Sequence, residues 1–254
     1  MNINLRMLMN APLSNLYAVR ELQLVLSHLK IECEDRILEI GCGNGLGSII
    51  VSKISKEVVG LDISALVIKL LKDNYERHNL KFVCMDATRE CPRSMLGYFS
   101  KVFCIDVMEH IEREKREKLL MFASDSLMRG GQLVFTFPVN NLNHGYLITK
   151  EDVYEFVTHL SESFARVDVK FLKNNLVGQI VDNFYGGIQK MLVPPKEGNF
   201  FEDSSCFQML QNPKWYYKLI KLGTFLLFKL SAHSYKATEP IRCSRALIIG
   251  VDKK

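Results

Sequence analysis

The sequence has no hydrophobic run long enough to cross a membrane, since no window reaches the roughly 20 apolar residues that a spanning helix needs. The first fifteen residues contain one Arg and no uninterrupted apolar core, so no secretory signal is expected there. No internal repeat or low-complexity tract is present. With 48% hydrophobic and 24% charged residues in a chain of 254, the composition is typical of a folded domain with a substantial core.

Cysteine is present but follows no ligand or disulfide pattern. The seven cysteines are an odd number, and no two of them are separated by two residues, so neither a disulfide framework nor a zinc site is expected. Several lie in apolar runs such as FVCM and VFCI, where a free thiol acts as a small buried side chain. The sequence therefore predicts a reducing, cytoplasmic location and no bound metal.

Strong charge is also missing. The chain holds 33 basic and 28 acidic residues, a net charge of +5, without a concentrated Lys/Arg tract. That excess permits contact with an anionic surface but does not argue for one, and a nucleic-acid partner is not expected.

Short apolar runs alternate with helical stretches, which is the pattern of an α/β sheet with helices on its faces. Helices are expected to begin at the caps Ser64 and Thr149, and the helix after residue 112 is expected to end at a left-handed cap formed by Gly130 and Gly131. The predicted strands are 36–41, 58–62, 81–86, 101–106, 132–137, 166–172 and 245–252.

The predicted fold is therefore α/β, a doubly wound, mostly parallel seven-stranded sheet. Residues 173–240 interrupt the hairpin between the last two strands, and a connection of this length usually carries a function or a structure of its own. We interpret it as an inserted helical cap. The main domain then consists of residues 1–172 plus 241–254.

A glycine-rich loop, GCGNGLG (41–47), follows the first strand. Glycines let a backbone turn sharply and approach a ligand closely. A dinucleotide-binding loop needs G-x-G-x-x-G, but counting from Gly41 the third position is Leu46, and counting from Gly43 it is Ser48. An NAD-dependent oxidoreductase is therefore the least favoured enzyme class.

Acidic residues follow at the ends of the next strands. Asp62 closes the second strand about 20 residues after the loop, where a carboxylate can accept hydrogen bonds from ribose hydroxyls. Asp86 ends the third strand, and the segment IDVMEHI (105–111) ends the fourth. In an open α/β sheet the carboxyl ends of the strands form the ligand crevice.

In this order the motifs resemble those of the class I S-adenosylmethionine-dependent methyltransferases, whose first motif is an acidic residue before a G-x-G-x-G loop. The resemblance covers about residues 12–172 and the last strand. It implies that the glycines line S-adenosyl-L-methionine, that Glu39 helps hold its amino group through water, and that Asp62 binds the ribose. The residues that it implies for cofactor binding are Glu39, Gly41, Cys42, Gly43, Asn44, Gly45, Asp62, Ile63, Met85, Asp86, Ala87, Ile105, Asp106 and His110.

The same resemblance assigns the adenine ring to the second and third strand ends. Ile63 would stack on the ring, Met85 would pack against it, and Asp86 would accept from its amino group. The backbone at Ile105 and Asp106 would face the methionine portion of the cofactor.

The fourth motif indicates the methyl acceptor. The D-V-M-E-H-I form is seen in small-molecule and lipid-precursor methyltransferases, while the Asn- or Asp-Pro-Pro-aromatic tetrapeptide of adenine-amine methyltransferases is missing. We therefore expect an enzyme that methylates oxygen or carbon of a small-molecule or lipid-linked substrate, with residues 173–240 as the substrate-side cap. An RNA or protein methyltransferase and a non-catalytic cofactor-binding module remain the alternatives.

Two histidines are candidates for a general base, because imidazole titrates near neutral pH. His144 lies just past the fifth strand, where substrate would approach the methyl group, although it can equally be an exposed loop residue. His110 fits better as a support for the cofactor loop.

Residues 214–233 form a predicted helix with a wide apolar face. At helical spacing Lys214, Lys218, Lys221 and Lys229 fall on one stripe. The helix either packs on the domain with a solvated lysine edge, or lies on an anionic membrane surface with Trp215 at the boundary. The sequence leaves both open, together with a membrane-peripheral location, and predicts no oligomeric state.

Overall fold

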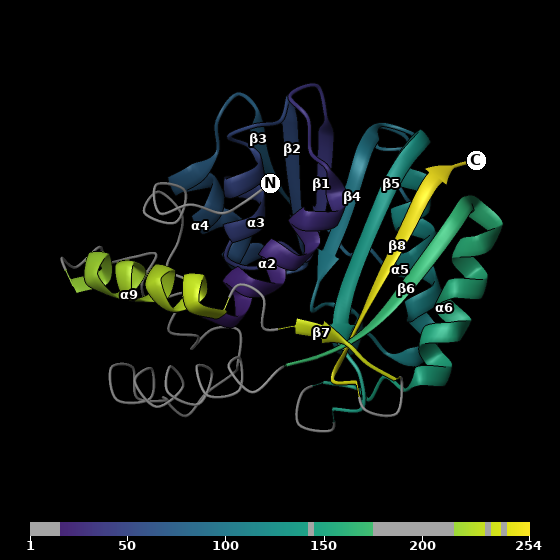
Figure 1. Ribbon diagram of the computed structural model, residues 1–254. Helices are drawn as coiled ribbons and strands as arrows, with labels where there is room; N and C mark the ends of the chain where they lie inside the picture. Colours follow the sequence, from purple (N-terminus) through teal and green to yellow (C-terminus); the bar gives the residue numbers. More distant parts are fainter. Residues whose placement is uncertain (1–15, 142–144, 175–215, 232–234, 240–242) are drawn as a thin grey trace.

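The computed structural model describes residues 16–141, 145–174, 216–231, 235–239 and 243–254, and these contain one eight-stranded sheet with the order β3-β2-β1-β4-β5-β8-β6-β7 (Figure 1). The first five strands along the chain run parallel, whereas β8 is antiparallel to both β5 and β6, and β7 is antiparallel to β6. The strands are β1 (Arg36–Ile40), β2 (Glu57–Asp62), β3 (Leu80–Cys84), β4 (Phe99–Ile105), β5 (Leu127–Pro138), β6 (Phe164–Asn174), β7 (Tyr235–Ala237) and β8 (Arg245–Lys253).

The α/β class and the predominance of parallel strands are confirmed, but the prediction of seven strands is wrong. The eighth strand is β7, a segment of three residues that lies inside the predicted insertion and pairs with the end of β6. Three residues are too few to show the alternation of apolar and polar side chains by which strands are recognised in a sequence.

Helices cover both faces of the sheet (Figure 1). One apolar core lies between the sheet and α5 with α6, and a second lies between the sheet and α2, α3 and α4. The helices are α2 (Leu16–Leu29), α3 (Leu46–Val51), α4 (Ala65–Tyr75), α5 (Arg113–Ser126), α6 (Lys150–Ser163) and α9 (Tyr216–Ser231), and a short 3₁₀ turn, η1 (Met108–His110), follows β4.

Two predicted helix caps are confirmed. The Ser64 hydroxyl accepts from the amide of Val67 at 3.4 Å at the start of α4. At α6 the cap is reciprocal, because Thr149 Oγ1 accepts from the Asp152 amide and the Asp152 carboxylate accepts from the Thr149 amide. Both caps fix where the chain leaves a loop at the carboxyl edge of the sheet and enters a helix.

The predicted glycine cap after α5 is wrong. The helix ends at Ser126, and the chain turns directly into β5, so that Gly130 and Gly131 lie inside this strand. Gly130 does have the expected left-handed backbone, with a φ of 74°. It belongs instead to an irregularity in the pairing with β4, where one residue of β4 lies opposite four of β5 between the pairs Phe99–Leu127 and Lys101–Gln132.

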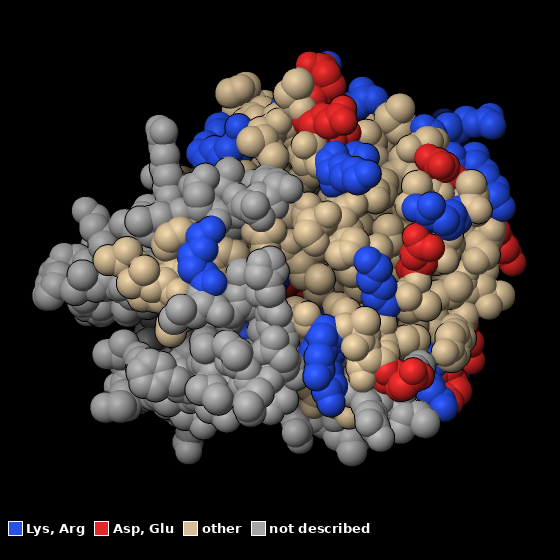
Figure 2. Space-filling model, in the orientation of Figure 1, with Lys and Arg blue, Asp and Glu red and all other residues tan. Residues whose placement is uncertain are grey.

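The described part of the predicted insertion packs on the main domain. Helix α9 contacts α2, and Phe228 and Thr224 are buried there at 2% exposure each. Leu226 on the same helix is 55% exposed. Within the described residues no helix is long and apolar enough to span a bilayer. Figure 2 shows that on the face in view the lysine and arginine side chains are spread over the described surface, with aspartate and glutamate side chains among them.

Candidate functional site

A pocket of about 390 Å³ lies at the carboxyl ends of β1 to β4. The pocket is lined by the glycine loop and by the residues that end each of these strands. In an open sheet of parallel strands, ligands bind in the crevice at these carboxyl ends. Ten of the residues predicted to bind the cofactor line it, namely Gly41, Gly43, Asp62, Ile63, Met85, Asp86, Ala87, Ile105, Asp106 and His110.

The glycine loop is left-handed at three positions, with φ values of 71° at Gly41, 48° at Gly43 and 78° at Gly45. A Cβ at Gly41 would meet Val107 Cγ2 at 2.1 Å, so this glycine lets the loop pack against the chain that follows β4. A Cβ at Gly43 would meet no atom within 4 Å, although Gly43 lines the pocket. The loop therefore leaves open space on the pocket side, where a ligand can approach the backbone.

Asp62 stands between the loop and helix α4. Its Oδ2 accepts from the Gly43 amide and its Oδ1 from the Ser64 amide, each at 2.9 Å. These two hydrogen bonds fix the carboxylate in place, and each oxygen keeps a second lone pair for a ligand hydroxyl. The next residue, Ile63, leaves 71% of its surface exposed at the pocket, which offers an apolar face to a flat ring.

Asp86 is held in a similar way by the residue two positions later. Its Oδ1 accepts from the Thr88 amide at 2.9 Å and from the Thr88 hydroxyl at 2.7 Å. These hydrogen bonds, first of all that from the hydroxyl, lower the pKa of Asp86 below its usual range. Asp86 is therefore an ionised acceptor at neutral pH.

Glu39 does not line the pocket. Its buried carboxyl accepts from the Ser48 amide and hydroxyl, both at 2.5 Å, and a Cβ at Gly47 would meet it at 2.2 Å. Burial raises the pKa of Glu39 to about 8. The structure thus places Glu39 behind the loop, where it supports the start of α3, and its predicted link to the cofactor's amino group stays a prediction.

Three other predicted residues also lie off the pocket wall. Cys42 is buried and donates its amide to Leu61 O at 2.7 Å, while Asn44 accepts from the Leu46 amide within the loop. Gly45 packs against Leu71, whose Cδ2 lies 2.8 Å from where a Cβ would be. These residues shape the loop from behind. His144 lies outside the described residues.

A buried network of charges next to the pocket was missed by sequence reasoning. Arg245 Nη1 lies 2.6 Å from Asp106 Oδ1 and 3.0 Å from Glu21 Oε2, and it donates to Thr136 Oγ1 at 2.9 Å. The Tyr235 hydroxyl donates to the other oxygen of Glu21. The only signal in the sequence is an arginine at the head of the otherwise apolar run RALIIGV.

Burial shifts the ionisation of this network. It raises the pKa of Asp106 to about 7, and it raises the pKa of Glu21, an effect to which the Asp106 charge adds. It lowers the pKa of Arg245 to about 9. The network therefore holds groups whose charge states change closer to neutral pH than they do in water.

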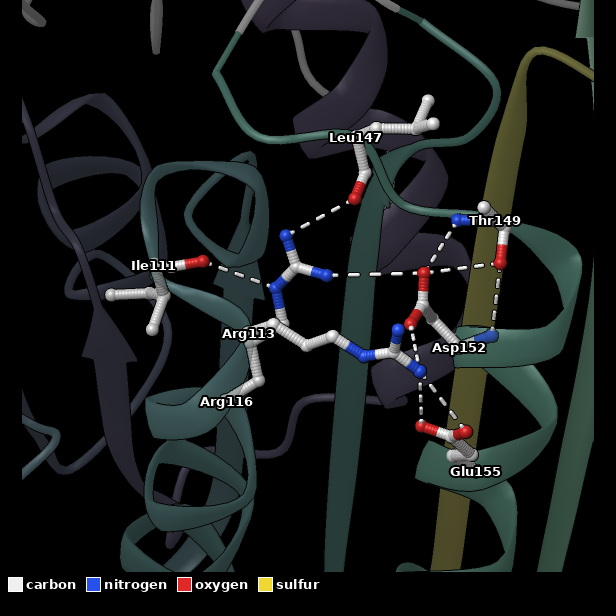
Figure 3. Close-up of polar contacts among 7 residues, drawn as sticks. All are labelled: Ile111, Arg113, Arg116, Leu147, Thr149, Asp152 and Glu155. Atoms are coloured by element: carbon white, nitrogen blue, oxygen red, sulfur yellow. Dashed lines mark hydrogen bonds and ion pairs between the residues drawn. The ribbon is translucent and has the colours of Figure 1, made fainter.

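A second charge network lies between α5, the start of α6 and the segments that follow β4 and β5 (Figure 3). Arg116 of α5 is 2% exposed and donates to Ile111 O at 3.1 Å and to Leu147 O at 3.3 Å. Its third nitrogen lies 3.9 Å from Asp152 in the cap of α6, a carboxylate that Arg113 also approaches, at 3.3 Å. One guanidinium thus ties the segment after β4 to the segment after β5.

Glu109 lies between these two networks. Both of its carboxyl oxygens are buried and have no hydrogen-bond partner in the described part of the chain. Burial, and then the charge of Asp106, raise the pKa of Glu109 to about 8. Across residues 16–141 and the other described ranges, no three His, Cys, Asp or Glu side chains are grouped so as to hold a metal ion.

Residues 37–131 match a protein family described as "Methyltransferase domain". Among curated proteins, a ubiquinone biosynthesis O-methyltransferase of Coxiella burnetii is 28% identical over 118 residues, which are 44% of this chain and 47% of that protein. The chain thus matches about half the length of this relative.

Among solved structures, a SAM-dependent methyltransferase from Archaeoglobus fulgidus superposes with a TM-score of 0.53 at 16% identity, covering 95% of each chain. The [4+2]-cyclase SpnF superposes with a TM-score of 0.54 at 12% identity, covering 93% of this chain and 82% of its own. At such identities these similarities show the fold alone.

Proposed function

We propose that the chain is a class I S-adenosylmethionine-dependent methyltransferase that transfers the methyl group of S-adenosyl-L-methionine to an oxygen of a small-molecule or lipid-linked acceptor. The observation that carries the proposal is the single pocket in which the glycine loop and the acidic ends of β2 and β3 meet.

The donor set of this pocket fits the cofactor. The Asp62 carboxylate is a fixed acceptor that would hold the ribose hydroxyls, and the ionised Asp86 would accept from the adenine amino group. Exposed Ile63 and the neighbouring Met85 would cover the faces of the ring, and the space above Gly43 leaves room for the sugar.

The bound cofactor would supply an electrophilic methyl group on a sulfonium sulfur. The contribution of the protein is then to orient the acceptor in line with that methyl group and to exclude water. Val107 and Ile111 provide apolar surface at the β4 end of the pocket, where the networks of Arg245 and Arg116 fix the backbone.

The type of acceptor rests on the named relatives. Ubiquinone biosynthesis O-methyltransferases of Coxiella burnetii and Brucella ovis are among the curated proteins similar to this chain, which supports oxygen of a small molecule as the acceptor rather than RNA or protein. On the face that Figure 2 shows, acidic side chains lie among the basic ones, which does not favour a polyanionic partner on that face. The superposition with a cyclase is a reminder that this fold alone does not determine the reaction.

Calorimetric titration with S-adenosylmethionine, S-adenosylhomocysteine and NAD tests the first half of the proposal. We expect binding of the first two and none of NAD. Asp62→Ala should weaken both, whereas Asp73→Ala, an exposed carboxylate on α4, should not. Binding of NAD, or equal binding by both variants, would contradict the assignment.

A labelled-methyl screen tests the second half. Purified protein is incubated with labelled S-adenosylmethionine and four acceptor classes, namely phenols, prenylated phenols in detergent, bulk RNA and peptides. The proposal expects label in the phenol classes, and label in RNA or peptide alone would replace it.

We also propose a cytoplasmic location with peripheral contact to anionic membrane through residues 214–233. The support is the exposed Leu222, Leu226 and Lys229 on α9, while the packing of Phe228 on α2 limits how much of the helix can take part. Cosedimentation with phosphatidylglycerol vesicles at low salt is the test. Wild type should pellet and Leu226→Glu should not, and absence of wild type from the pellet would remove the proposal.

A further inference from the structure

Asp106 is the point at which the buried charge network reaches the pocket. The side chain of Asp106 keeps 22% of its surface exposed and lines the pocket, whereas Arg245 and Glu21 are exposed by 2% and 0%. The backbone of Asp106 is left-handed, with a φ of 54°, and its amide donates to Thr136 O at 3.0 Å. Strained backbone conformations of this kind cluster at functional sites, so the conformation of Asp106 beside the pocket suggests a functional role.

The two oxygens of Asp106 have different surroundings. Oδ1 is clamped by Arg245 at 2.6 Å. Oδ2 accepts no hydrogen bond from the described residues. One oxygen thus fixes the orientation of the carboxylate, and the other is left for a ligand.

The position of Asp106 along the pocket indicates which ligand its Oδ2 would meet. The groups suited to ribose and adenine, Asp62 and Asp86, lie at the ends of β2 and β3, while Asp106 lies at the end of β4. An elongated cofactor whose nucleoside is held at the ends of β2 and β3 would point its sulfonium end toward β4. The open oxygen of Asp106 therefore lies on the side where the acceptor must meet the methyl group.

We propose that Asp106 is the residue that takes the proton from the acceptor hydroxyl, and that Arg245 and Glu21 are the positioning residues that hold it for this step. The inference rests on the function proposed above. It also narrows the acceptor to a molecule whose reacting oxygen carries a proton, such as a phenol, and disfavours a carbon acceptor.

The step balances as follows. The acceptor oxygen forms a bond to the methyl carbon while the bond between that carbon and the sulfonium sulfur breaks, and the sulfur keeps the electron pair. The hydroxyl proton passes to Oδ2 of Asp106. Methyl ether and S-adenosylhomocysteine leave, and the proton then returns to water.

The charge environment suits this exchange. Burial raises the pKa of Asp106 to about 7, and proton acceptors work best when their pKa lies near the operating pH. The groups that face Asp106 are Arg245 from β8, Glu21 from α2 and Glu109 from η1. The charge of Asp106 in turn raises the pKa of Glu21 and of Glu109.

Glu109 and His110 are the competing proton acceptors. Both oxygens of Glu109 are enclosed, and Glu109 does not line the pocket. His110 does line the pocket, so it enters the experiment as the rival, with His110→Gln compared to Asp106→Asn.

The first measurement needs no acceptor. Carbon NMR of protein labelled at the Asp carboxyl is followed against pH in the S-adenosylhomocysteine complex, and Asp106→Asn assigns the signal. In wild type we expect the Asp106 signal to titrate with a midpoint near pH 7. Arg245→Met should raise this midpoint by about one pH unit, because the positive charge is lost. Arg245→Lys keeps the charge and should change the midpoint little, and it serves as the second variant if Arg245→Met does not fold. A wild-type midpoint below about 5 would overturn the inference.

The second measurement is the pH profile of kcat with the phenol found in the screen. Wild type should gain activity through a limb near pH 7. Asp106→Asn should lose that limb and about 100-fold or more in kcat, with the affinity for S-adenosylhomocysteine within threefold of wild type. A limb that survives in Asp106→Asn but disappears in His110→Gln assigns the proton to His110 and contradicts the inference alone. If no acceptor is methylated, the result contradicts the proposed function and therefore also the role of Asp106 that depends on it.

Discussion

The two ends of the pocket are built in different ways. At the β2 and β3 end, each carboxylate is held by groups near to it in the sequence, since Asp62 contacts residues 2 and 19 positions away and Asp86 contacts the residue 2 positions away. At the β4 end, Arg245 and Asp106 are 139 positions apart, and Tyr235 and Glu21 are 214 apart.

We interpret this difference as a division between cofactor binding at the β2 and β3 end and methyl transfer at the β4 end. The end that would hold the nucleoside is a series of strand ends and caps, each formed almost locally, and it is open to solvent. The end where we place the reaction depends on α2, β5, β7 and β8 meeting correctly, and its charges are buried. Changes at the second end should therefore affect stability and chemistry together, and changes at the first should affect binding.

The largest effect is expected for Arg245→Met. Removing the guanidinium takes the ion-pair partner away from both Glu21 and Asp106, and only Glu21 then keeps the charge of a second arginine, Arg20, near it. Breaking a buried ion pair in this way costs about 3–5 kcal/mol of unfolding free energy. Urea unfolding at pH 7 measures it, with Arg166→Met on the exposed edge of β6 as the control. Equal midpoints for the two variants would show that the buried ion pairs of Arg245 do not stabilise the fold.

Within the glycine loop, we expect Gly41→Ala to lower mainly the stability of the fold and Gly43→Ala to lower mainly the affinity for the ligand. The first places a Cβ against Val107 at a left-handed position and should lower stability by roughly 2–3 kcal/mol. The second meets open space and should cost about 1 kcal/mol, the strain of its backbone. Calorimetry should show that Gly43→Ala is the variant that weakens S-adenosylhomocysteine binding while still folded. Full binding by folded Gly43→Ala would mean that the ligand lies elsewhere.

Asp62→Asn tests the recognition end by itself. The amide keeps the size of the carboxylate but replaces one acceptor oxygen with a donor that faces the amide of Gly43 or of Ser64. We expect affinity for S-adenosylhomocysteine to fall about tenfold, or ~1.4 kcal/mol, with a smaller change in melting temperature. Asp73→Asn is the matched control. A large loss of stability without loss of affinity would reverse the distinction between the two ends.

A further prediction concerns the pH dependence that Glu39 gives to stability. Its folded-state pKa of about 8 is above the ordinary value of 4.5, so its contribution to stability is complete below about pH 4.5 and is lost as the pH rises toward 8. Wild-type stability should therefore fall between pH 5 and 8, and Glu39→Gln should flatten that slope by up to about 1 kcal/mol per pH unit. Thermal melts across this range measure it. Parallel slopes in the two proteins would mean that Glu39 is ionised in the folded state.

Much of the recognition end was predictable because its signals are local. Helix caps at Ser64 and Thr149, left-handed glycines and acidic strand ends each follow from residues within a few positions of one another. Glu39 shows the limit of this approach. The sequence places an acid before the loop, but whether its carboxyl faces the ligand or Ser48 depends on how α3 packs behind the loop.

By itself, then, the sequence determined the α/β class, the position of most strands along the chain and ten of the residues that line the pocket. Only the tertiary structure decided that β7 adds an eighth strand, that Gly130 lies within β5, and that Arg245 connects Glu21 to Asp106. The physical reason is that periodicity and capping act over a few residues. The pairing of buried charges depends instead on which strands become neighbours in the sheet, and β8 lies between β5 and β6 whatever its distance along the chain.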